Sequence, residues 1–277
     1  MTAPATALFA ECELTPAQFA RIAHVLYEHA GIRMRVGKEG LVRARLTKRL
    51  WKLGLSDFEA YLNFVEGEPE KQEFAEMIDA LTTNKTSFLR EAAHFDFLRD
   101  RVFPSIPGAM RIWSAGCSSG EEPYTLAMLC SEVFPDMAKR DVRILATDIS
   151  HRVLAHARAG VYPAENMSDV PAAWLQKYWV RKEDTSGPVV FEAERHLRRL
   201  VNFAKLNLMD RWPMQGPFDV ILCRNVMIYF DKSTQQQLIE RYWGLLRPGG
   251  HLLVGHSESL TGLTHRFQYV QPAVYVK

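Results

Sequence analysis

The stretch Trp113-Ser-Ala-Gly-Cys-Ser-Ser-Gly-Glu-Glu-Pro-Tyr124 decides the fold of this chain. It follows the short apolar run 110–113 and precedes apolar residues at helical spacing, so it predicts a strand, a turn of small residues and a helix. Gly116 and Gly120 would let the backbone pass close to a ligand, because neither residue carries a Cβ. A tight strand-to-helix connection without a ligand fits the same pattern, so the turn alone leaves both interpretations open.

A second pattern, in residues 142–148, favours a ligand. The apolar run 142–147 predicts a buried strand that ends on Asp148, where a carboxylate can accept hydrogen bonds from two ribose hydroxyls. The Gly-x-Gly-x-x-Gly phosphate cradle is absent, and Glu121 and Glu122 at the helix start would repel a pyrophosphate. These residues favour a positively charged nucleoside cofactor without phosphate, and S-adenosylmethionine is the obvious candidate.

Apolar spacing divides the chain into a helical part and an α/β part. Residues 1–80 predict a small domain of four helices. The first starts at Thr15 and Pro16, the second is 38–53, a capping box at Ser56–Glu59 opens the third, and Pro69 introduces the fourth. Residues 81–95 form the predicted linker. After it, short apolar runs alternate with helices, which is typical of a doubly wound α/β sheet.

The predicted sheet has further strands and one long insertion. Residues 160–200 are too many for a simple crossover, and they predict a short helix and a small hairpin, which we place at about 162–200. The insertion could contact a partner or be a rigid loop packed on its own aromatic residues. The remaining predicted elements are strands at 200–206, 218–223 and 251–255, a terminal hairpin within 267–276, and a helix 233–246 ending at Pro248-Gly249-Gly250.

Composition limits the class of protein. The 277 residues carry a net charge of +2, with 47% apolar and 24% charged residues, as expected of a globular protein long enough for two domains. The four cysteines show no metal-ligand spacing with the nine histidines, so we predict no metal and no disulfide framework. The N-terminus lacks a signal peptide pattern, and no apolar run reaches the roughly 18 residues of a membrane span. We therefore expect a cytoplasmic protein without membrane insertion.

Two polar segments carry candidate chemistry. The Thr, Asn and Ser residues of 82–87 could be helix caps, but a linker that faces the sheet could add side chains to the cofactor site, and Arg90 could then orient a substrate carboxylate. Arg224, Asn225 and Tyr229 follow the fourth predicted strand, at the sheet edge where ligands bind. Cys223 lies within that strand and follows no proline, so we interpret it as a buried structural thiol.

The predicted second helix is basic. Arg45, Lys48, Arg49 and Lys52 fall at i, i+3, i+4 and i+7 and make a basic ridge. An anionic partner would explain it. Nucleic acid and an acidic protein surface both remain open, although no aromatic residues interleave the ridge.

Six segments of the sequence resemble the CheR proteins, the chemotaxis receptor glutamate O-methyltransferases. They are Thr83-Asn-Lys-Thr-Ser-Phe-Leu-Arg-Glu91, Trp113–Tyr124, Ala146-Thr-Asp-Ile149, Asn207-Leu208, Cys223-Arg-Asn-Val-Met-Ile-Tyr-Phe-Asp231 and Gly255-His-Ser-Glu-Ser259. The resemblance implies a Rossmann-like class I methyltransferase sheet over residues 96–277, with an N-terminal all-helical domain and a small inserted β-subdomain. It also implies S-adenosylmethionine as methyl donor, S-adenosylhomocysteine as product, and a monomer.

The resemblance further implies roles for individual residues. Arg90 and Tyr229 match the residues thought to act in methyl transfer, and the basic helix matches the one that faces the methylation helices of the receptor's cytoplasmic domain. In one branch of the family a glycine-rich loop of the insertion binds a receptor pentapeptide, but the loop Val180–Pro188 has one glycine and extra charge, which counts against such binding here. Residues matching the cofactor contacts are Asn84, Thr86, Arg90, Glu121, Asp148, Asn207, Leu208, Arg224 and Asn225, to which the glycine turn adds Gly116.

Two other functions remain open at this point. A nucleic-acid methyltransferase could use the basic ridge for phosphates, and a non-catalytic protein could hold the cofactor as a sensor. The first would show binding to DNA or RNA with a steep salt dependence.

Overall fold

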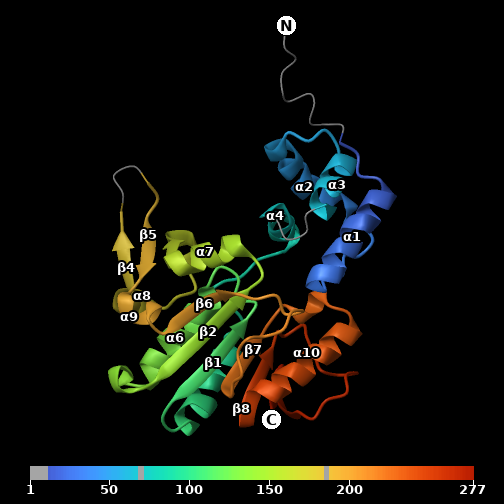
Figure 1. Ribbon diagram of the computed structural model, residues 1–277. Helices are drawn as coiled ribbons and strands as arrows, with labels where there is room; N and C mark the ends of the chain where they lie inside the picture. The colour runs from blue at the N-terminus through green and yellow to red at the C-terminus, as the bar shows by residue number, and fades with distance from the viewer. Residues whose placement is uncertain (1–11, 68–71, 184–186) are drawn as a thin grey trace. The chain divides into compact units, whose positions relative to one another are not determined.

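The computed structural model describes residues 12–67, 72–183 and 187–277 (Figure 1). The chain forms two compact units, one up to Thr83 and the other from Asn84 to Lys277. The segment predicted as a linker, 81–95, therefore divides between the two units. In the described ranges no helix combines the length and the apolar character that crossing a bilayer requires.

The N-terminal unit is built from helices in its described residues. The start of the first helix is as predicted, because Thr15 accepts a hydrogen bond from the Gln18 amide at 3.2 Å and the Gln18 side chain accepts one from the Thr15 amide. Such a cap contributes about 1 kcal/mol. Gly31, in the left-handed conformation, ends this helix. The helices are α1 (Pro16–Ala30), α2 (Glu39–Leu53), α3 (Phe58–Glu66) and α4 (Gln72–Leu81).

The capping box predicted at Ser56–Glu59 is wrong by one residue. Asp57 is the N-cap of α3, and its carboxylate accepts the Ala60 amide at 2.8 Å, while the Ser56 hydroxyl donates to Asp57. The carboxylate is the stronger acceptor for an amide at a helix start, so it takes the cap position. Pro69, predicted to introduce the fourth helix, lies outside the described residues.

The second unit contains a seven-stranded sheet of order β6-β2-β1-β7-β8-β10-β9. β1 lies between β2 and β7 and is parallel to both, so the order reverses at this strand, as in the predicted doubly wound sheet (Figure 1). The strands are β1 (Met110–Ala115), β2 (Val142–Asp148), β6 (Val201–Lys205), β7 (Phe218–Cys223), β8 (Leu246–Val254), β9 (Gln268–Gln271) and β10 (Val274–Val276). The main helices around the sheet are α5 (Ala93–Phe97), α6 (Glu121–Val133), α7 (His151–Ala159) and α10 (Lys232–Leu245).

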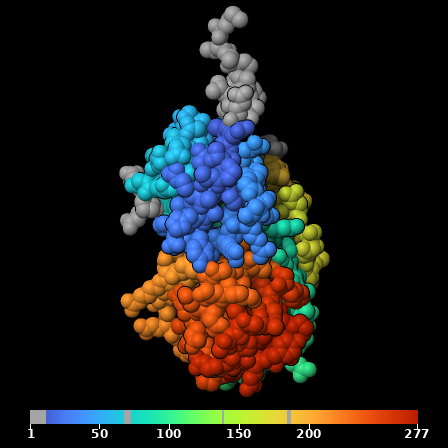
Figure 2. Space-filling view, turned by 90° about the vertical axis from the view of Figure 1, so that its right-hand side faces the viewer, coloured from blue at the N-terminus to red at the C-terminus, as the bar shows by residue number. Residues whose placement is uncertain are grey.

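Strand residues alternate between two apolar cores, one on each face of the sheet. In β1, Met110 and Ile112 belong to the core shared with α6, whereas Trp113 and Ala115 belong to the core shared with α10. This alternation follows from the two-residue period of a strand. Helix α10 packs on the second face, and it belongs to the C-terminal part of the chain, which is coloured orange to red in Figure 2. Both faces being buried explains why the sequence shows continuous apolar runs.

The predicted boundary between the last long helix and the next strand is wrong. The helix ends at Leu245, and β8 begins at Leu246, so Pro248, Gly249 and Gly250 lie within the strand. The reason is long-range pairing with the last residue of the chain. The Gly249 amide donates to the Lys277 carbonyl at 2.8 Å, and the Lys277 amide donates to the Gly250 carbonyl at 2.9 Å.

The insertion forms a small antiparallel sheet of order β3-β5-β4. Its helix and hairpin were predicted, but the third strand was not, because it is only three residues long. Tyr162 of this strand donates a hydrogen bond from its hydroxyl to the Ser119 carbonyl at 2.7 Å, which ties the insertion to the turn after β1. The elements are β3 (Val161–Pro163), α8 (Ala172–Tyr178), β4 (Trp179–Lys182), β5 (Val190–Ala193) and α9 (Arg195–Arg198).

Candidate functional site

The turn after β1 is held against the tip of β2. The Asp148 carboxylate accepts the Ser118 amide and the Ser150 amide, each at 2.9 Å. The Gly116 amide donates to the Thr147 carbonyl at 2.8 Å. The acid predicted from the sequence therefore lies beside the glycine turn, and its buried carboxylate fixes the path of that turn. A carboxylate at a strand tip is the kind of group that accepts hydrogen bonds from ribose hydroxyls.

Gly116 and Gly120 are required by close packing of the protein itself. A Cβ on Gly116 would lie 2.4 Å from Cγ2 of Val226, which follows β7, and the φ of Gly116 is 82°. A Cβ on Gly120 would lie 2.8 Å from both the Tyr162 hydroxyl and the Cβ of Ala157. The two glycines thus bring the tips of β1 and β7 together and seat the insertion on the turn.

Glu121 is a buried acid at the start of α6. Its side chain is 3% exposed and accepts a hydrogen bond from the Ser119 hydroxyl at 2.7 Å. Burial raises the pKa of this carboxyl above its usual value of 4.5, and the Ser119 hydrogen bond opposes that shift only in part. A carboxylate in such a place is stabilised by a cation, so the residue suits a positively charged ligand.

Arg224 joins the tip of β7 to two other segments. Its guanidinium donates to Glu122 of α6 at 2.8 Å, to Glu91 at 3.0 Å, and to the Arg90 carbonyl. The Arg224 side chain is 3% exposed. The sequence placed Arg224 at the edge where ligands bind. In the structure its guanidinium instead joins three segments of the protein to one another. Burial raises the pKa of Glu91, but the Arg224 charge and the hydrogen bonds from Arg224, the His256 backbone and Asn225 together outweigh burial and lower it.

Glu258 holds the backbone after β7. Its carboxylate accepts the amides of Gly255 at 2.6 Å, Asn225 at 2.8 Å and Ile228 at 3.1 Å. Burial raises the pKa of this carboxyl above its usual value, although these amides oppose the shift. Asn225 has a φ of 59°, which costs a non-glycine residue free energy, and the three hydrogen bonds hold it in place. Its side-chain amide donates to Glu91 at 3.3 Å.

The segment 84–91 runs along the same edge of the sheet. The Ser118 hydroxyl donates to the Asn84 carbonyl at 3.0 Å, which brings this segment onto the turn after β1. Arg90 is half-buried and its guanidinium donates to the Lys85 carbonyl at 2.8 Å, while Thr86 is also half-buried. Two residues of the predicted linker therefore contact the site through their backbone carbonyls. The Asn84 carbonyl accepts from Ser118, and the Arg90 carbonyl accepts from Arg224.

The remaining predicted residues follow β6 and β7. Asn207 accepts the Met209 amide at 3.1 Å and donates to Asp210, and Leu208 is buried. Tyr229 is half-buried in the short turn η6 (Met227–Tyr229). Cys223 is fully buried and burial raises the pKa of its thiol, which confirms the prediction of a structural thiol.

The match to known proteins covers both units. Residues 84–276 match the CheR methyltransferase SAM binding domain, and residues 17–82 match the CheR methyltransferase all-alpha domain. The chain belongs to the CheR methyltransferase family. The predicted fold class, a Rossmann-like class I methyltransferase sheet with an all-helical N-terminal domain and a small separate β-sheet, is confirmed.

Curated CheR relatives align with nearly the whole chain. A probable chemotaxis protein methyltransferase of Rhizobium etli is 43% identical, over 86% of this chain and 91% of the relative. The chemotaxis protein methyltransferase of Escherichia coli is 41% identical, over 95% and 91% of the two chains. That of Borreliella burgdorferi is 39% identical, over 95% of each chain.

The basic helix of this CheR chain differs from its prediction in one respect. Arg45 donates to the carbonyls of Ala80, Leu81 and Thr82 at the end of α4, and Arg49 pairs with Glu73 and Glu76. These two arginines hold α2 against α4, so they are not part of an exposed ridge. The exposed basic residues of this region are Arg33, Arg35, Lys38, Arg43, Lys48 and Lys52.

Sequence reasoning on this CheR chain missed three acids of the site. Glu122 was considered only as a group that repels pyrophosphate, and Glu91 and Glu258 only as parts of matching segments. A signal existed for Glu258, because it follows the tip of a buried strand at the edge where ligands bind. For Glu91 and Glu122 the signal would have been their common partner, Arg224, which only the fold reveals.

Proposed function

We propose that this protein transfers a methyl group from S-adenosylmethionine to glutamate side chains of chemotaxis receptors, giving methyl esters. The observation that carries the proposal is the match of both units to the CheR methyltransferase domains. The relatives named as chemotaxis protein methyltransferases support the receptor as substrate. A substrate in the cytoplasmic part of a receptor requires a cytoplasmic enzyme.

The cofactor site we propose lies at the carboxyl ends of β1, β2, β6 and β7. Asp148 would bind the ribose hydroxyls, and the buried carboxylate of Glu121 would face a positive group of the cofactor. Arg224 would act by holding the loop around the cofactor, because its guanidinium is already occupied by Glu91 and Glu122. The other cofactor residues proposed are Asn84, Thr86, Arg90, Gly116, Asn207, Leu208 and Asn225.

The chemistry requires alignment rather than a base. S-adenosylmethionine supplies a methyl group activated by a sulfonium. A glutamate carboxylate, with an ordinary pKa near 4.3, is ionised at neutral pH. With that methyl group bound, the carboxylate would need only to be aligned with it, and no side chain would have to remove a proton.

Arg90 and Tyr229 are the residues we propose to act on the substrate. Arg90 would hold the carboxylate in line with the methyl group, and Tyr229 would donate a hydrogen bond near that group. In the free protein Arg90 donates to a backbone carbonyl, which it can exchange for the substrate at little cost. Each transfer removes one negative charge from a receptor helix and relieves repulsion between acids at i and i+4.

The exposed basic residues of the N-terminal unit suit the acidic helices of a receptor. Lys48 and Lys52 lie on α2, and the other exposed basic residues lie on α2 or just before it. Such a surface speeds association with an acidic partner. The inserted sheet is the candidate for any further docking, and we do not assign it a receptor pentapeptide.

The test is methyl transfer from labelled S-adenosylmethionine to purified receptor cytoplasmic fragments. We expect label that base releases as methanol, and its loss when receptor glutamates are changed to alanine. Replacing Arg90 with Ala should lower kcat by about 100-fold, much more than it weakens cofactor binding. Label incorporated into DNA or RNA instead would support the nucleic-acid function, and cofactor binding without any transfer would support a sensor.

A further inference from the structure

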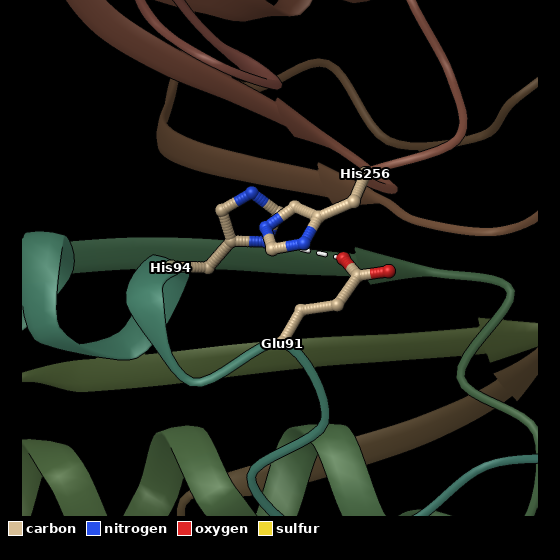
Figure 3. Close-up of side chains that lie close together, drawn as sticks. All are labelled: Glu91, His94 and His256. Carbon is tan, nitrogen blue, oxygen red and sulfur yellow. Dashed lines mark ion pairs between the residues drawn. The ribbon is translucent and has the colours of Figure 1, made fainter.

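Three side chains of the sheet unit converge from separate segments: Glu91, His94 and His256 (Figure 3). Glu91 precedes α5, His94 lies in α5, and His256 follows β8. One potential ligand atom from each residue lies within 4.8 Å of the other two. Histidine nitrogens and a carboxylate oxygen in one place are the donors that zinc and related metals prefer.

His94 is the residue that points to a ligand. Its side chain is 1% exposed, and neither ring nitrogen has a hydrogen-bond partner. The nearest groups are the Glu91 carboxylate, 3.5 Å from Nδ1, and the ring of His256, whose centroid lies 4.7 Å away. Buried polar atoms without partners cost about 1–3 kcal/mol. A metal bound to one nitrogen would remove part of that cost.

The distances suit a tetrahedral site. Zinc–nitrogen bonds of about 2.0–2.1 Å place two ligands of a tetrahedron about 3.3 Å apart. Glu91 and His94 are already near that separation, at 3.5 Å. The side chain of His256 is exposed, so rotation of its ring can bring its nitrogen closer without disturbing the core.

The surrounding charges also allow a cation. Arg224 is the cation that faces the cluster, since it contacts Glu91 at 3.0 Å, but Glu122 also pairs with it at 2.8 Å. Two carboxylates for one guanidinium leave one net negative charge. Arg224 donates to Oε2 of Glu91, the oxygen nearest His94, and Asn225 donates to Oε1, so both would orient the carboxylate as outer partners orient metal ligands in known sites.

We propose that Glu91, His94 and His256 bind one divalent transition-metal ion, such as Zn²⁺, and leave a fourth position for water. Magnesium and calcium are poor candidates, because they prefer oxygen ligands. The ion would connect the segment that carries Arg90 to the loop that carries Glu258. Cysteine and histidine spacing did not reveal this group, because its members come together only in the fold.

The test uses the full-length protein without a histidine tag, stripped with a chelator and titrated with Zn²⁺ by calorimetry. We expect one ion per chain and a rise in the melting temperature with Zn²⁺. Co²⁺ as a probe should give the visible absorption of a tetrahedral site. Changing His256 to Ala should weaken Zn²⁺ binding by about 100-fold or more, since a direct ligand is lost.

The matched control is His265→Ala, which removes another exposed histidine of the same C-terminal region. This variant should bind Zn²⁺ as the unaltered protein does. Because His256 is exposed, its replacement should leave the fold intact, which the far-UV spectrum and the binding of S-adenosylhomocysteine would check. Binding that is absent in the unaltered protein, or equal in His256→Ala, would overturn the proposal without touching the methyl-transfer function.

Discussion

Arg224 and Glu122 form an ion pair of 2.8 Å between the tip of β7 and the first turn of α6. The Arg224 side chain is 3% exposed and that of Glu122 is 13% exposed. Because Glu91 is the second partner of the same guanidinium, this pair joins three segments that are distant in the sequence. The geometry of the candidate site therefore depends on a buried charge cluster, and such clusters are sensitive to the loss of one member.

Replacing Arg224 with Met should destabilise the protein by about 3–5 kcal/mol, because it leaves two largely buried carboxylates without their cation. Denaturant unfolding would measure the loss. Arg143 provides the control, since its pair with Asp141 is exposed at 59% and 50%. Arg143→Met should cost no more than about 1 kcal/mol. Equal effects of the two variants would show that the Arg224 cluster has no special role.

Gly116→Ala should destabilise the protein by about 2 kcal/mol or more. The new Cβ overlaps Val226, and the alanine would have to keep the positive φ of Gly116. Adding Val226→Ala removes the overlapping Cγ2 and should recover part of the loss. Gly262→Ala is the matched control, since its φ is 79° and no atom lies within 4 Å of the added Cβ. It should cost only the φ penalty, about 1 kcal/mol. Thermal melts of the four proteins decide whether the overlap matters.

Cofactor affinity should fall as the pH is lowered from neutral. Burial raises the pKa of Glu121 above 4.5, so this carboxylate takes up a proton earlier than an ordinary glutamate and loses its attraction for a cation. Glu121→Gln should bind S-adenosylmethionine roughly 10-fold more weakly at neutral pH, because hydrogen bonds to charged groups contribute about 1.5–3 kcal/mol. Its affinity should also vary less with pH. If the affinity of Glu121→Gln for S-adenosylmethionine varied with pH as that of the unaltered protein does, Glu121 would not be a cofactor residue.

Reversing two charges on α2, Lys48→Glu with Lys52→Glu, should raise the KM for the receptor about tenfold through lost electrostatic attraction, with the largest effect at low salt. Cofactor affinity should not change. The control reverses Lys139 and Arg143, both exposed, near the start of β2 and at the opposite end of that strand from Asp148. If both double variants raise KM equally, net charge rather than the α2 surface governs binding.

Sequence patterns predicted the helices and strands that are determined by local features, such as an apolar run or a helix cap. The buried strands β1, β2 and β7 were predicted from apolar runs, and α1 from its cap and closing glycine. Prediction failed where a distant partner decides. Gly249 and Gly250 join β8 because they pair with Lys277, and β3 exists because β5 lies beside it.

The same distinction applies to the site. The positions of Gly116, Asp148 and Asn225 at neighbouring strand tips followed from the order of the strands. The side-chain partnerships did not. Arg224 looked available for a ligand in the sequence but is occupied by Glu91 and Glu122, and Arg45 and Arg49 looked exposed but hold α2 against α4. A long basic side chain can take either role, and only its neighbours in space decide between them.

The hydroxyl of Tyr162, in the inserted sheet, donates to the Ser119 carbonyl in the turn after β1. The inserted sheet therefore packs directly against this turn. A Cβ on Gly120 would lie too close to the Tyr162 hydroxyl to fit between the sheet and the turn. The insertion therefore cannot be deleted or exchanged as a free-standing module. An insertion taken from another protein would have to place an aromatic hydroxyl at the same point. Without it, the Ser119 carbonyl would lose this hydrogen bond.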